Sequence, residues 1–381
     1  MKEGWEVKRL GEVCEITMGQ SPSSESYNDI GRGMPFFQGC SDFGKLYPHV
    51  TTYCDMPKKM ADINDVLISV RAPIGTLNIA NLHCCIGRGL ASVREIKGLS
   101  CYKYLYFFLL KSKEELQEKG TGATFKAIGK DTLLNFPILV PSIEEQSRIV
   151  EELDLLSNII EKKRQQLSEL DNLAQSIFYD MFGDPVTNEK GWEVKKLGEV
   201  CDVRDGTHDS PKYLEHSDYV LITSKNIVNG DIDYTSINYI CEEDYNNINK
   251  RSFVEDGDII MAMIGTIGKP IIVKRKGVNF CIKNVALIKF GKSVEVINTY
   301  IQYLLDNTSY KQYIDKQNKG GTQKFIALGA IRKLDIPLPP LNLQQLFAKK
   351  IEAIEKQKAL IKQSIAETEE LFNSRMDYYF S

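Results

Sequence analysis

The chain has 381 residues, of which 43% are apolar and 26% are charged, enough for two hydrophobic cores of ordinary size. Its 48 basic and 51 acidic side chains nearly balance, so binding of a polyanion would require charge that is sorted by face or supplied by a partner. No apolar run approaches the roughly 20 residues that cross a bilayer, and no signal peptide opens the sequence. These properties exclude a membrane protein, and we expect a cytoplasmic one.

The cysteines and histidines give no sign of a disulfide framework or a metal site. The nine cysteines are an odd number without a C-x-x-C pair, which indicates reduced thiols. The four histidines have no metal-ligand spacing. We therefore expect no bound metal.

One segment near the start of the chain occurs twice. Residues 4–14 read GWEVKRLGEVC, and residues 191–201 read GWEVKKLGEVC. The glycine-rich residues 120–129 and 320–329 also correspond, in the same order. The repeat is too long for a solenoid, so each copy is a domain followed by a helix. The predicted boundaries are a first domain at 1–141, a central helix at 142–182, a second domain at 183–340 and a C-terminal helix at 341–381.

The globular copies have mixed secondary-structure signals in the same order. The first contains a short helix or turn around residues 7–10, a strand-like run at 66–70 and a helical pattern near 102–119. The second contains a strand-like run at 259–263 and a helical pattern near 296–317. Both domains are therefore predicted to be α+β.

Polar loops follow the repeated segments, at residues 17–24 in one copy and 204–211 in the other. Arginine can form paired hydrogen bonds with guanine, and glutamine or asparagine with adenine. Such loops are also common as plain turns, and composition alone does not separate the two interpretations.

Each copy ends in a long helical pattern free of Gly and Pro, with apolar residues spaced alternately by four and three. This spacing is typical of a coiled-coil seam. The pattern could also pack each helix on its own domain. The predicted seam consists of Ile149, Leu153, Leu156, Ile160, Leu167, Leu170 and Ile177, with Phe347, Ile351, Ile354, Ile361, Ile365 and Phe372.

Chain connectivity predicts the direction of the two helices. A parallel pair would require the second domain to carry the chain back along a helix of roughly 60 Å, at about 1.5 Å per residue. An antiparallel pair needs no such return. We therefore expect two similar α+β domains joined by two long antiparallel coiled-coil helices, with pseudo-two-fold symmetry.

Lys163 and Lys358 interrupt the seam of apolar residues. Their side chains either extend their charged ends to its edge or fix the register of the two helices.

A search for catalytic motifs finds none. The G-x-G pairs lack the spacing of a dinucleotide fingerprint, and residues 265–269 lack the first glycine of a phosphate loop. The two E-x-K triplets lack the preceding Pro-Asp pair of a nuclease and are better explained as surface segments. The chain is therefore predicted to be non-catalytic.

The duplicated GWEVKxLGEV segments, the GGTQKFI turn at 320–326, the IPLPP run at 336–340 and the two long helices resemble a type I restriction-modification specificity subunit. This resemblance implies that each globular unit is a target recognition domain reading one half of a bipartite, asymmetric DNA site. The helices would then act as a spacer. The resemblance also implies that the chain directs adenine-N6 methylation and restriction by partner subunits.

The resemblance further implies the partners. They are double-stranded DNA, two modification (methyltransferase) subunits and restriction (motor-nuclease) subunits. This chain would hold no cofactor, since S-adenosylmethionine (AdoMet) and ATP with magnesium would belong to those subunits.

On this interpretation, candidate DNA contacts are polar residues in the loops of both domains. Arg71 and Arg88 could equally form surface salt bridges, and His208 beside Asp209 could be a turn residue. Lys126 and Lys324 flank glycine turns and fit phosphate contacts. The candidates are Gln20, Ser21, Ser23, Arg71, Arg88, Thr124 and Lys126 in the first domain, and Arg204, Thr207, His208, Lys225, Asn226, Thr322 and Lys324 in the second.

A second hypothesis keeps the same architecture but makes it a protein-binding scaffold with two peptide-recognition modules and no DNA specificity. Mapping methylated sites in a complex with an adenine methyltransferase separates the two hypotheses.

Overall fold

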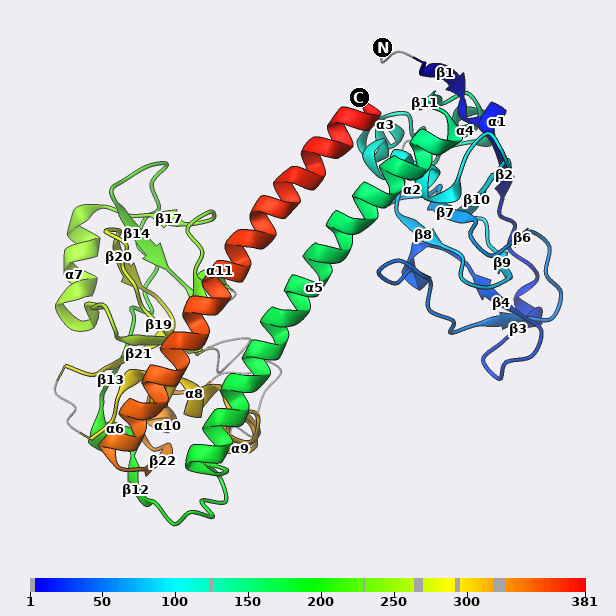
Figure 1. The fold of residues 1–381 in the computed structure, drawn as a ribbon. Helices are drawn as coiled ribbons and strands as arrows, with labels where there is room; N and C mark the ends of the chain where they lie inside the picture. Colours follow the sequence, from blue (N-terminus) through cyan, green and yellow to red (C-terminus); the bar gives the residue numbers. More distant parts are fainter. Residues whose placement is uncertain (1–3, 123–125, 229, 264–269, 292–294, 318–325) are drawn as a thin grey trace. The chain divides into compact units, whose positions relative to one another are not determined.

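The computed structural model describes residues 4–122, 126–228, 230–263, 270–291, 295–317 and 326–381 (Figure 1). The chain divides into two compact units, Met1–Arg164 with Gln363–Ser381, and Gln165–Lys362. The two predicted long helices are confirmed as α5 (Ile143–Phe182) and α11 (Leu341–Phe380), each 40 residues long. Among the described residues, no helix combines the length and apolarity that a membrane span requires.

The globular part of the first unit contains two main sheets. The four-stranded sheet is antiparallel and has the order β2 (Cys14–Met18), β10 (Leu90–Glu95), β7 (Val66–Ser69), β8 (Leu77–Ile79). The other sheet has the order β3 (Tyr27–Asn28), β5 (Tyr53–Cys54), β4 (Met34–Phe37), β9 (Cys84–Ile86), β6 (Met60–Ala61), and its β4 and β9 are parallel. The first unit also contains β1 (Glu6–Arg9) paired with β11 (Pro137–Val140), the helices α1 (Leu10–Val13), α2 (Tyr102–Lys111), α3 (Lys113–Glu118) and α4 (Lys130–Leu134), and the 3-10 turns η1 (Ser24–Ser26) and η2 (Cys40–Asp42).

The second unit has a similar order of elements, with α7 and the β15–β16 pair as additions. Its four-stranded sheet is β13 (Asp202–Asp205), β21 (Val285–Lys289), β18 (Ile259–Ala262), β19 (Ile271–Ile272), and its three-stranded sheet is β17 (Asn238–Tyr239), β14 (Tyr219–Ile222), β20 (Asn279–Ile282), with β14 and β20 parallel. The remaining elements are β12 (Glu193–Lys196) paired with β22 (Asp335–Leu338), the pair β15 (Ile227–Val228) and β16 (Asp231–Ile232), η3 (Ser224–Asn226), α6 (Leu197–Val200), α7 (Glu242–Ser252), α8 (Asn298–Asp306), α9 (Thr308–Gln317) and α10 (Leu328–Arg332). The prediction of two similar α+β domains is confirmed.

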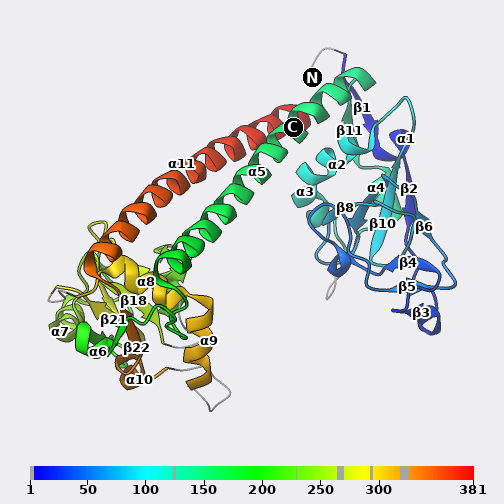
Figure 2. The ribbon, with the colours of Figure 1, turned by 60° about the horizontal axis from the view of Figure 1, so that its bottom comes forward.

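In each unit, the four-stranded sheet lies between a helical layer and the other sheet. On β7, Val66 and Ile68 pack into the core shared with the helices, while Leu67 packs on the opposite face with Phe37. This alternation is the period of a strand, and burial on both faces explains why the run is continuously apolar. Figures 1 and 2 show that β3, β4 and β5 lie at the end of the first unit that is farthest from the start of α5.

The repeated segment contains one secondary-structure prediction that is wrong. A helix or turn was expected around residues 7–10, but residues 7–9 belong to the strand β1, which pairs with β11 from Val140 back to Pro137. The helix α1 begins only at Leu10, and its Glu12 accepts a hydrogen bond from the backbone N–H of Arg9. Pairing with a segment far away in the chain overrides the local pattern.

The two long helices pack on each other and also on the cores of the globular parts. In the first unit, Ile149 and Leu153 of α5 share one core with Met376 and Tyr379 of α11. In the second unit, Phe347 and Ile351 of α11 share a core with Phe178 and Phe182 of α5. Each core therefore holds the start of one helix and the end of the other.

Contacts within each unit show that the helices are antiparallel. In the first unit, Glu152 of α5 contacts Arg375 and Tyr379, while Lys163, further along α5, contacts Ser364. In the second unit, Asp171 contacts Lys358, and Phe182 lies 5.2 Å from Phe347 between ring centroids. All thirteen predicted seam residues are buried or half-buried.

The two lysines of the seam bind polar groups of the facing helix. The Lys163 ammonium donates to the Ser364 hydroxyl at 2.5 Å and to the Thr368 hydroxyl at 3.2 Å. The Lys358 ammonium pairs with Asp171 at 2.8 Å and with Glu355 of its own helix at 2.7 Å. Burial lowers the pKa of Lys358, but these hydrogen bonds outweigh it and leave the pKa raised. Such pairing favours one register of the helices.

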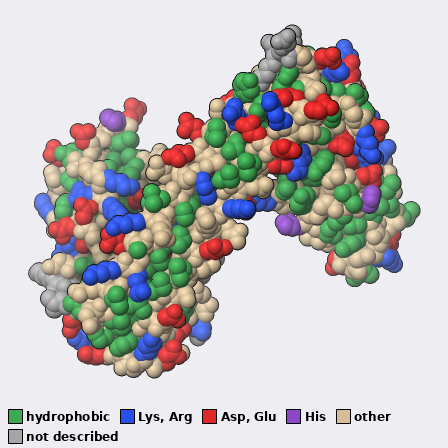
Figure 3. Space-filling view, in the orientation of Figure 1, with side chains coloured by type: hydrophobic (Ala, Val, Ile, Leu, Met, Phe, Trp, Pro, Cys, Tyr) green, Lys and Arg blue, Asp and Glu red, His purple; other side chains and the backbone are tan. Residues whose placement is uncertain are grey.

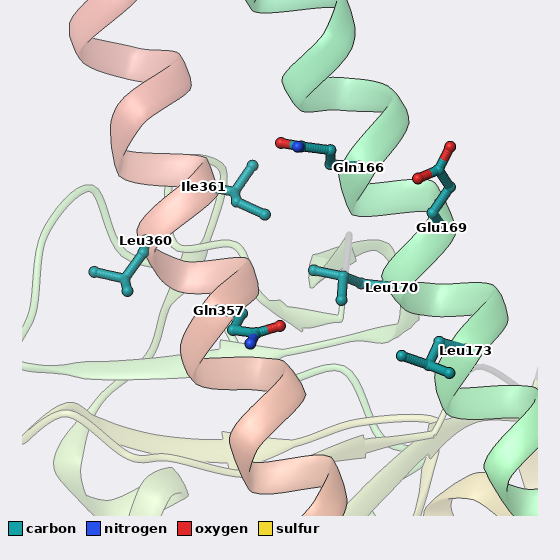
Figure 4. Close-up of a pocket in the computed structure, with 7 residues that line it drawn as sticks. All are labelled: Gln166, Glu169, Leu170, Leu173, Gln357, Leu360 and Ile361. Carbon is teal, nitrogen blue, oxygen red and sulfur yellow. The ribbon is translucent and has the colours of Figure 1, made fainter.

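In the second unit, the helix pair encloses a groove of about 560 Å³ (Figure 4). Leu170 of α5 and Ile361 of α11 point toward each other across it. Leu173 and Leu360 also line it and remain 48% and 67% exposed. The seam is therefore less tightly closed here than at Phe347.

A buried glutamine attaches the first turn of each long helix to its globular part. The Gln146 amide donates to the carbonyls of Leu99 and Pro141, and its oxygen accepts from the N–H of Cys101 at 3.0 Å. The Gln344 amide makes the three corresponding bonds, to the carbonyls of Glu295 and Pro339 and from the N–H of Ile297. Both side chains are fully buried, so these bonds fix where each helix begins.

We predict that Gln146→Ala and Gln344→Ala each destabilise the unit that carries the substitution by about 3 kcal/mol, because each leaves a buried N–H and two carbonyls unsatisfied. Urea unfolding of the whole chain measures this. Gln166→Ala is the control, because Gln166 is an exposed residue of α5. Equal stability of all three variants would contradict the anchoring role.

Candidate nucleic-acid interface

In the first unit, several strand ends and turns meet at one edge of the four-stranded sheet. The N–H of Gly19, after β2, donates to the carbonyl of Leu90 at 2.9 Å, and the N–H of Gln20 donates to Ile86 at 3.0 Å. The N–H of Gly87 donates to Phe37 at 2.8 Å. We call this region the strand-end edge, and in the first unit it comprises residues 19–21, 37–38, 70–72, 86–90 and 126–128.

The rest of this edge is joined in the same way. The N–H of Val70 donates to Gly89 at 2.9 Å, and the N–H of Ile128 donates to Val70 at 3.0 Å. The N–H of Ala72 donates to the carbonyl of Lys126 at 3.2 Å. Main-chain bonds therefore join segments from the two ends of the domain sequence into one surface.

The second unit builds the same edge from corresponding bonds. The N–H groups of Gly206, Thr207 and Lys283 donate to the carbonyls of Val285, Ile282 and Ile222, at 3.0, 3.0 and 2.8 Å. The N–H of Ile326 donates to Met263 at 2.9 Å, as Ile128 does to Val70. The strand-end edge of the second unit comprises residues 206–208, 222–223, 263, 282–285 and 326.

Glycine is required where the two chains of this edge approach each other. A Cβ atom on Gly19 would lie 2.1 Å from the carbonyl oxygen of Gly87, and one on Gly206 would lie 2.3 Å from that of Ile282. Contacts this short with backbone force the chain to move. The matched glycines explain how the loops keep their position while their other residues differ.

In the first unit, five of the predicted contacts lie on this edge. Gln20, Arg71, Arg88 and Lys126 are exposed, and the half-buried hydroxyl of Ser21 accepts a hydrogen bond from the N–H of Arg88 at 3.2 Å. The three cations form no ion pair with a described residue, so the alternative interpretation of Arg71 and Arg88 as salt bridges finds no support there. Ser23 is exposed on the same loop beyond the edge, and Thr124 lies outside the described residues.

In the second unit, the predicted contacts are more scattered. Thr207 and His208 lie on the strand-end edge, and exposed Lys225 follows it in η3. Arg204 lies on β13, where its guanidinium binds Asp202 at 2.6 Å and the carbonyl of Arg251 at 2.8 Å. The hydrogen bond with Asp202 raises the pKa of Arg204. Thr322 and Lys324 lie outside the described residues.

Asn226 has a structural role in this unit. Its side chain is 4% exposed, and its amide donates to the carbonyls of Asp233 and Ser236 while its oxygen accepts from Thr223. All its polar atoms are therefore used inside the fold. The DNA contact predicted for Asn226 stays a prediction, and we leave Asn226 out of the candidate interface.

The structure adds four residues that the sequence patterns did not indicate. Gln38 follows Phe37, and Thr223 follows Ile222, the two residues whose carbonyls accept from Gly87 and Lys283. Lys283 and Asn284 form the turn opposite Thr207. None belongs to a repeated motif, and the turn between β20 and β21 is one residue shorter than that between β9 and β10. Only the strand pairing reveals the equivalence.

The surface charge of the two units is mixed. On the face drawn in Figure 3, basic and acidic side chains are interspersed over both units, without a large basic field. Among the described residues, no cluster of His, Cys, Asp or Glu could hold a metal ion, and all nine cysteines are free thiols.

Comparison with known proteins assigns the family. The model of the type I restriction modification DNA specificity domain matches residues 2–172 and 189–370, which is most of the chain in two copies. The chain belongs to the type I restriction-modification specificity subunits. The two globular units are its target recognition domains, and the chain is the non-catalytic component of such a system.

The relatives agree with this assignment. The MjaIX and MjaVIII type I restriction enzyme specificity subunits of Methanocaldococcus jannaschii are 25% and 27% identical to the chain, covering 90% and 93% of it and 85% and 86% of themselves. Another protein of that organism, assigned as the MjaX specificity subunit, is 41% identical over 177 residues, which are 46% of this chain and 42% of that protein. The crystal structure of the type I restriction-modification S subunit from M. genitalium has the same fold, with a TM-score of 0.60 at 14% identity over 99% of this chain and 96% of that one.

We predict that Gly19→Ala destabilises the first target recognition domain by about 1–3 kcal/mol, because its Cβ would displace the turn at Gly87. Gly39→Ala is the control in the same domain, since a Cβ there meets no atom within 4 Å. Thermal unfolding of the two variants measures the difference. A melting temperature for Gly19→Ala as high as that of the control would show that the edge tolerates displacement.

Proposed function

We propose that this specificity subunit recognises a bipartite, asymmetric DNA site, and that the strand-end edge of each target recognition domain contacts one half-site. The observation that carries the proposal is that the same edge is built twice by matching main-chain bonds, while its side chains differ between the copies. A protein with two equivalent surfaces is suited to a site with two halves. Different side chains then read different bases in each half.

The side chains on the two edges suit contact with DNA. In the first domain, Arg71, Arg88 and Lys126 have no carboxylate partner among the described residues, and Gln20 lies beside them. Arginine and glutamine can form paired hydrogen bonds with guanine and adenine, and lysine can neutralise phosphate. In the second domain, Thr207, His208 and Asn284 occupy the corresponding surface.

We further propose that the partners are two modification subunits and restriction subunits. The modification subunits would bind AdoMet and methylate adenine at N6, and the restriction subunits would use ATP and magnesium. The specificity subunit itself would hold no cofactor and would direct these activities to its site. The mixed surface charge supports a complex in which the modification subunits supply part of the phosphate contact.

The test is to co-express the chain with the adenine methyltransferase subunit of its own system and to map N6-methyladenine in the host genome by sequencing. We expect one split motif with a fixed gap and different halves. A reconstituted, active complex that methylates adenine without sequence preference would contradict the proposal. It would favour the rival hypothesis of a protein-binding scaffold.

The helices provide a second test. Four residues inserted after Arg164, with four more inserted opposite in α11 after Lys362, lengthen each helix by about 6 Å and add slightly more than one helical turn. We expect the gap between half-sites to change or recognition to be lost, because each core fixes the helix ends attached to it. Both half-sites should stay the same in the methylation map. Altered half-sites would show that the helices do more than set distance.

A further inference from the structure

Both target recognition domains contain a contact at the same place across the strand-end edge, made by different residues and by different atoms. In the first domain, the Ser21 hydroxyl accepts from the N–H of Arg88 at 3.2 Å. In the second, Nδ1 of His208 lies 2.9 Å from the side-chain oxygen of Asn284. Ser21 follows Gln20, whose N–H donates to Ile86 at the end of β9, and His208 follows Thr207, whose N–H donates to Ile282 at the end of β20. Arg88 follows Gly87, whose N–H donates to Phe37 of β4, and Asn284 follows Lys283, whose N–H donates to Ile222 of β14. We call Ser21 with Arg88, and His208 with Asn284, the cross-turn pairs.

In the first domain, the cross-turn pair holds the backbone of Arg88 and leaves its guanidinium available. The side chain is exposed and forms no ion pair with a described residue. A guanidinium on a fixed backbone can donate two parallel hydrogen bonds to O6 and N7 of guanine. The first pair is therefore suited to a guanine.

In the second domain, the cross-turn pair orients an amide. Asn284 has a backbone φ of 55°, a conformation that asparagine tolerates better than most residues. The amide has two lone pairs on its oxygen and two N–H donors, so one hydrogen bond with His208, in either direction, leaves an acceptor and a donor for a ligand. These are the groups that asparagine uses to bind N6 and N7 of adenine.

A buried carboxylate holds His208 in this position. Oδ2 of Asp205 lies 2.9 Å from Nε2 of His208, and the Asp205 side chain is 7% exposed. Its other oxygen binds Arg251 at the end of α7. His208 therefore lies between the Asp205 carboxylate and the Asn284 amide, with one ring nitrogen within hydrogen-bond distance of each. In the strand pairing, Met18 takes the place of Asp205 in the first domain, so this arrangement belongs to the second domain alone.

We propose that the cross-turn pairs are the specificity-determining contacts, with Arg88 reading a guanine of the first half-site and Asn284 an adenine of the second. Asp205 is a positioning residue that acts through His208. This inference rests on the proposed function, because it names the residues by which each domain would read its half-site.

The test uses the complex of the chain with its methyltransferase subunits and compares methylation maps of variants. Arg88→Gln should lower the preference for one guanine of the first half-site about 10- to 100-fold and leave the second half-site unchanged. The control is Arg32→Gln, which removes the same charge from the same domain at an exposed arginine paired with Asp55, away from the strand-end edge. The control should keep the wild-type motif.

The second domain is tested by Asn284→Asp, which keeps the shape and the tolerance of positive φ but removes the NH₂ donor. The preference for one adenine of the second half-site should fall by a similar factor. Asn279→Asp, at an exposed asparagine of β20, is the control. Asp205→Asn and His208→Ala should weaken the preference at that same base pair only. A purely structural role of Asp205 would instead weaken the whole half-site.

The outcomes separate the two levels of the hypothesis. A wild-type complex without a split motif would overturn the proposed function and this inference with it. A split motif that Arg88→Gln and Asn284→Asp both leave unchanged would overturn the inference alone. Thermal unfolding measures whether each variant is folded. If Asp205→Asn does not fold, His208→Ala, a substitution at an exposed residue, tests the same positioning role.

Discussion

The main-chain hydrogen bonds that tie the end of β2 to the turn before β10, and the end of β13 to the turn before β21, are the constraint on which the candidate interface depends. They place Gln20 opposite Ile86 and Thr207 opposite Ile282, whatever side chains those positions carry. Because main-chain donors and acceptors are common to all residues except proline, which lacks the N–H, the loops can change sequence without losing position. Gly19 and Gly206, and in the first domain also Gly87 and Gly89, are restricted by close contact with backbone. The edge therefore combines a fixed main-chain frame with side chains that differ between the two domains.

A second constraint connects the recognition surface to the spacer. Gln146 and Gln344 bind the first turn of each long helix to the start of α2 and α8, and each core also holds the end of the other helix. Each core therefore holds the start of one long helix and the end of the other. The seam lysines, bound to Ser364 and Asp171, oppose sliding of one helix along the other.

Much of the fold could be predicted from the sequence because the signals were local and present twice. The spacing of Ile149, Leu153 and Leu156 predicts a coiled-coil seam without knowledge of the rest, and the end of α5 coincides with the Gly183 that follows it. The strand β1 was missed because its partner β11 lies far away in the chain, and no local pattern records that pairing. Helices expected at 102–119 and 296–317 are each divided, at Ser112 and Asn307.

The candidate interface was predictable only in part. Gln20, Ser21 and Thr207 follow the repeated segment at the same short distance in each copy, so their place in the loop could be inferred. Asn284 could not, because it matches Arg88 through strand pairing and not through sequence position. The burial of Asn226 and the pairing of Arg204 with Asp202 likewise depend on neighbours that the sequence does not reveal.

The central claim is that the two domains present equivalent strand-end edges that carry different residues. The most direct test is a chimera in which residues 14–136 are replaced by residues 201–334 of the same chain, joined where β2 matches β13 and where α4 matches α10. Methylation mapping of the chimera in complex with the methyltransferase subunits should yield the second half-site twice, as an inverted repeat with an unchanged gap. A folded, active chimera that still methylates the original asymmetric site, or that methylates a direct repeat, would contradict the account.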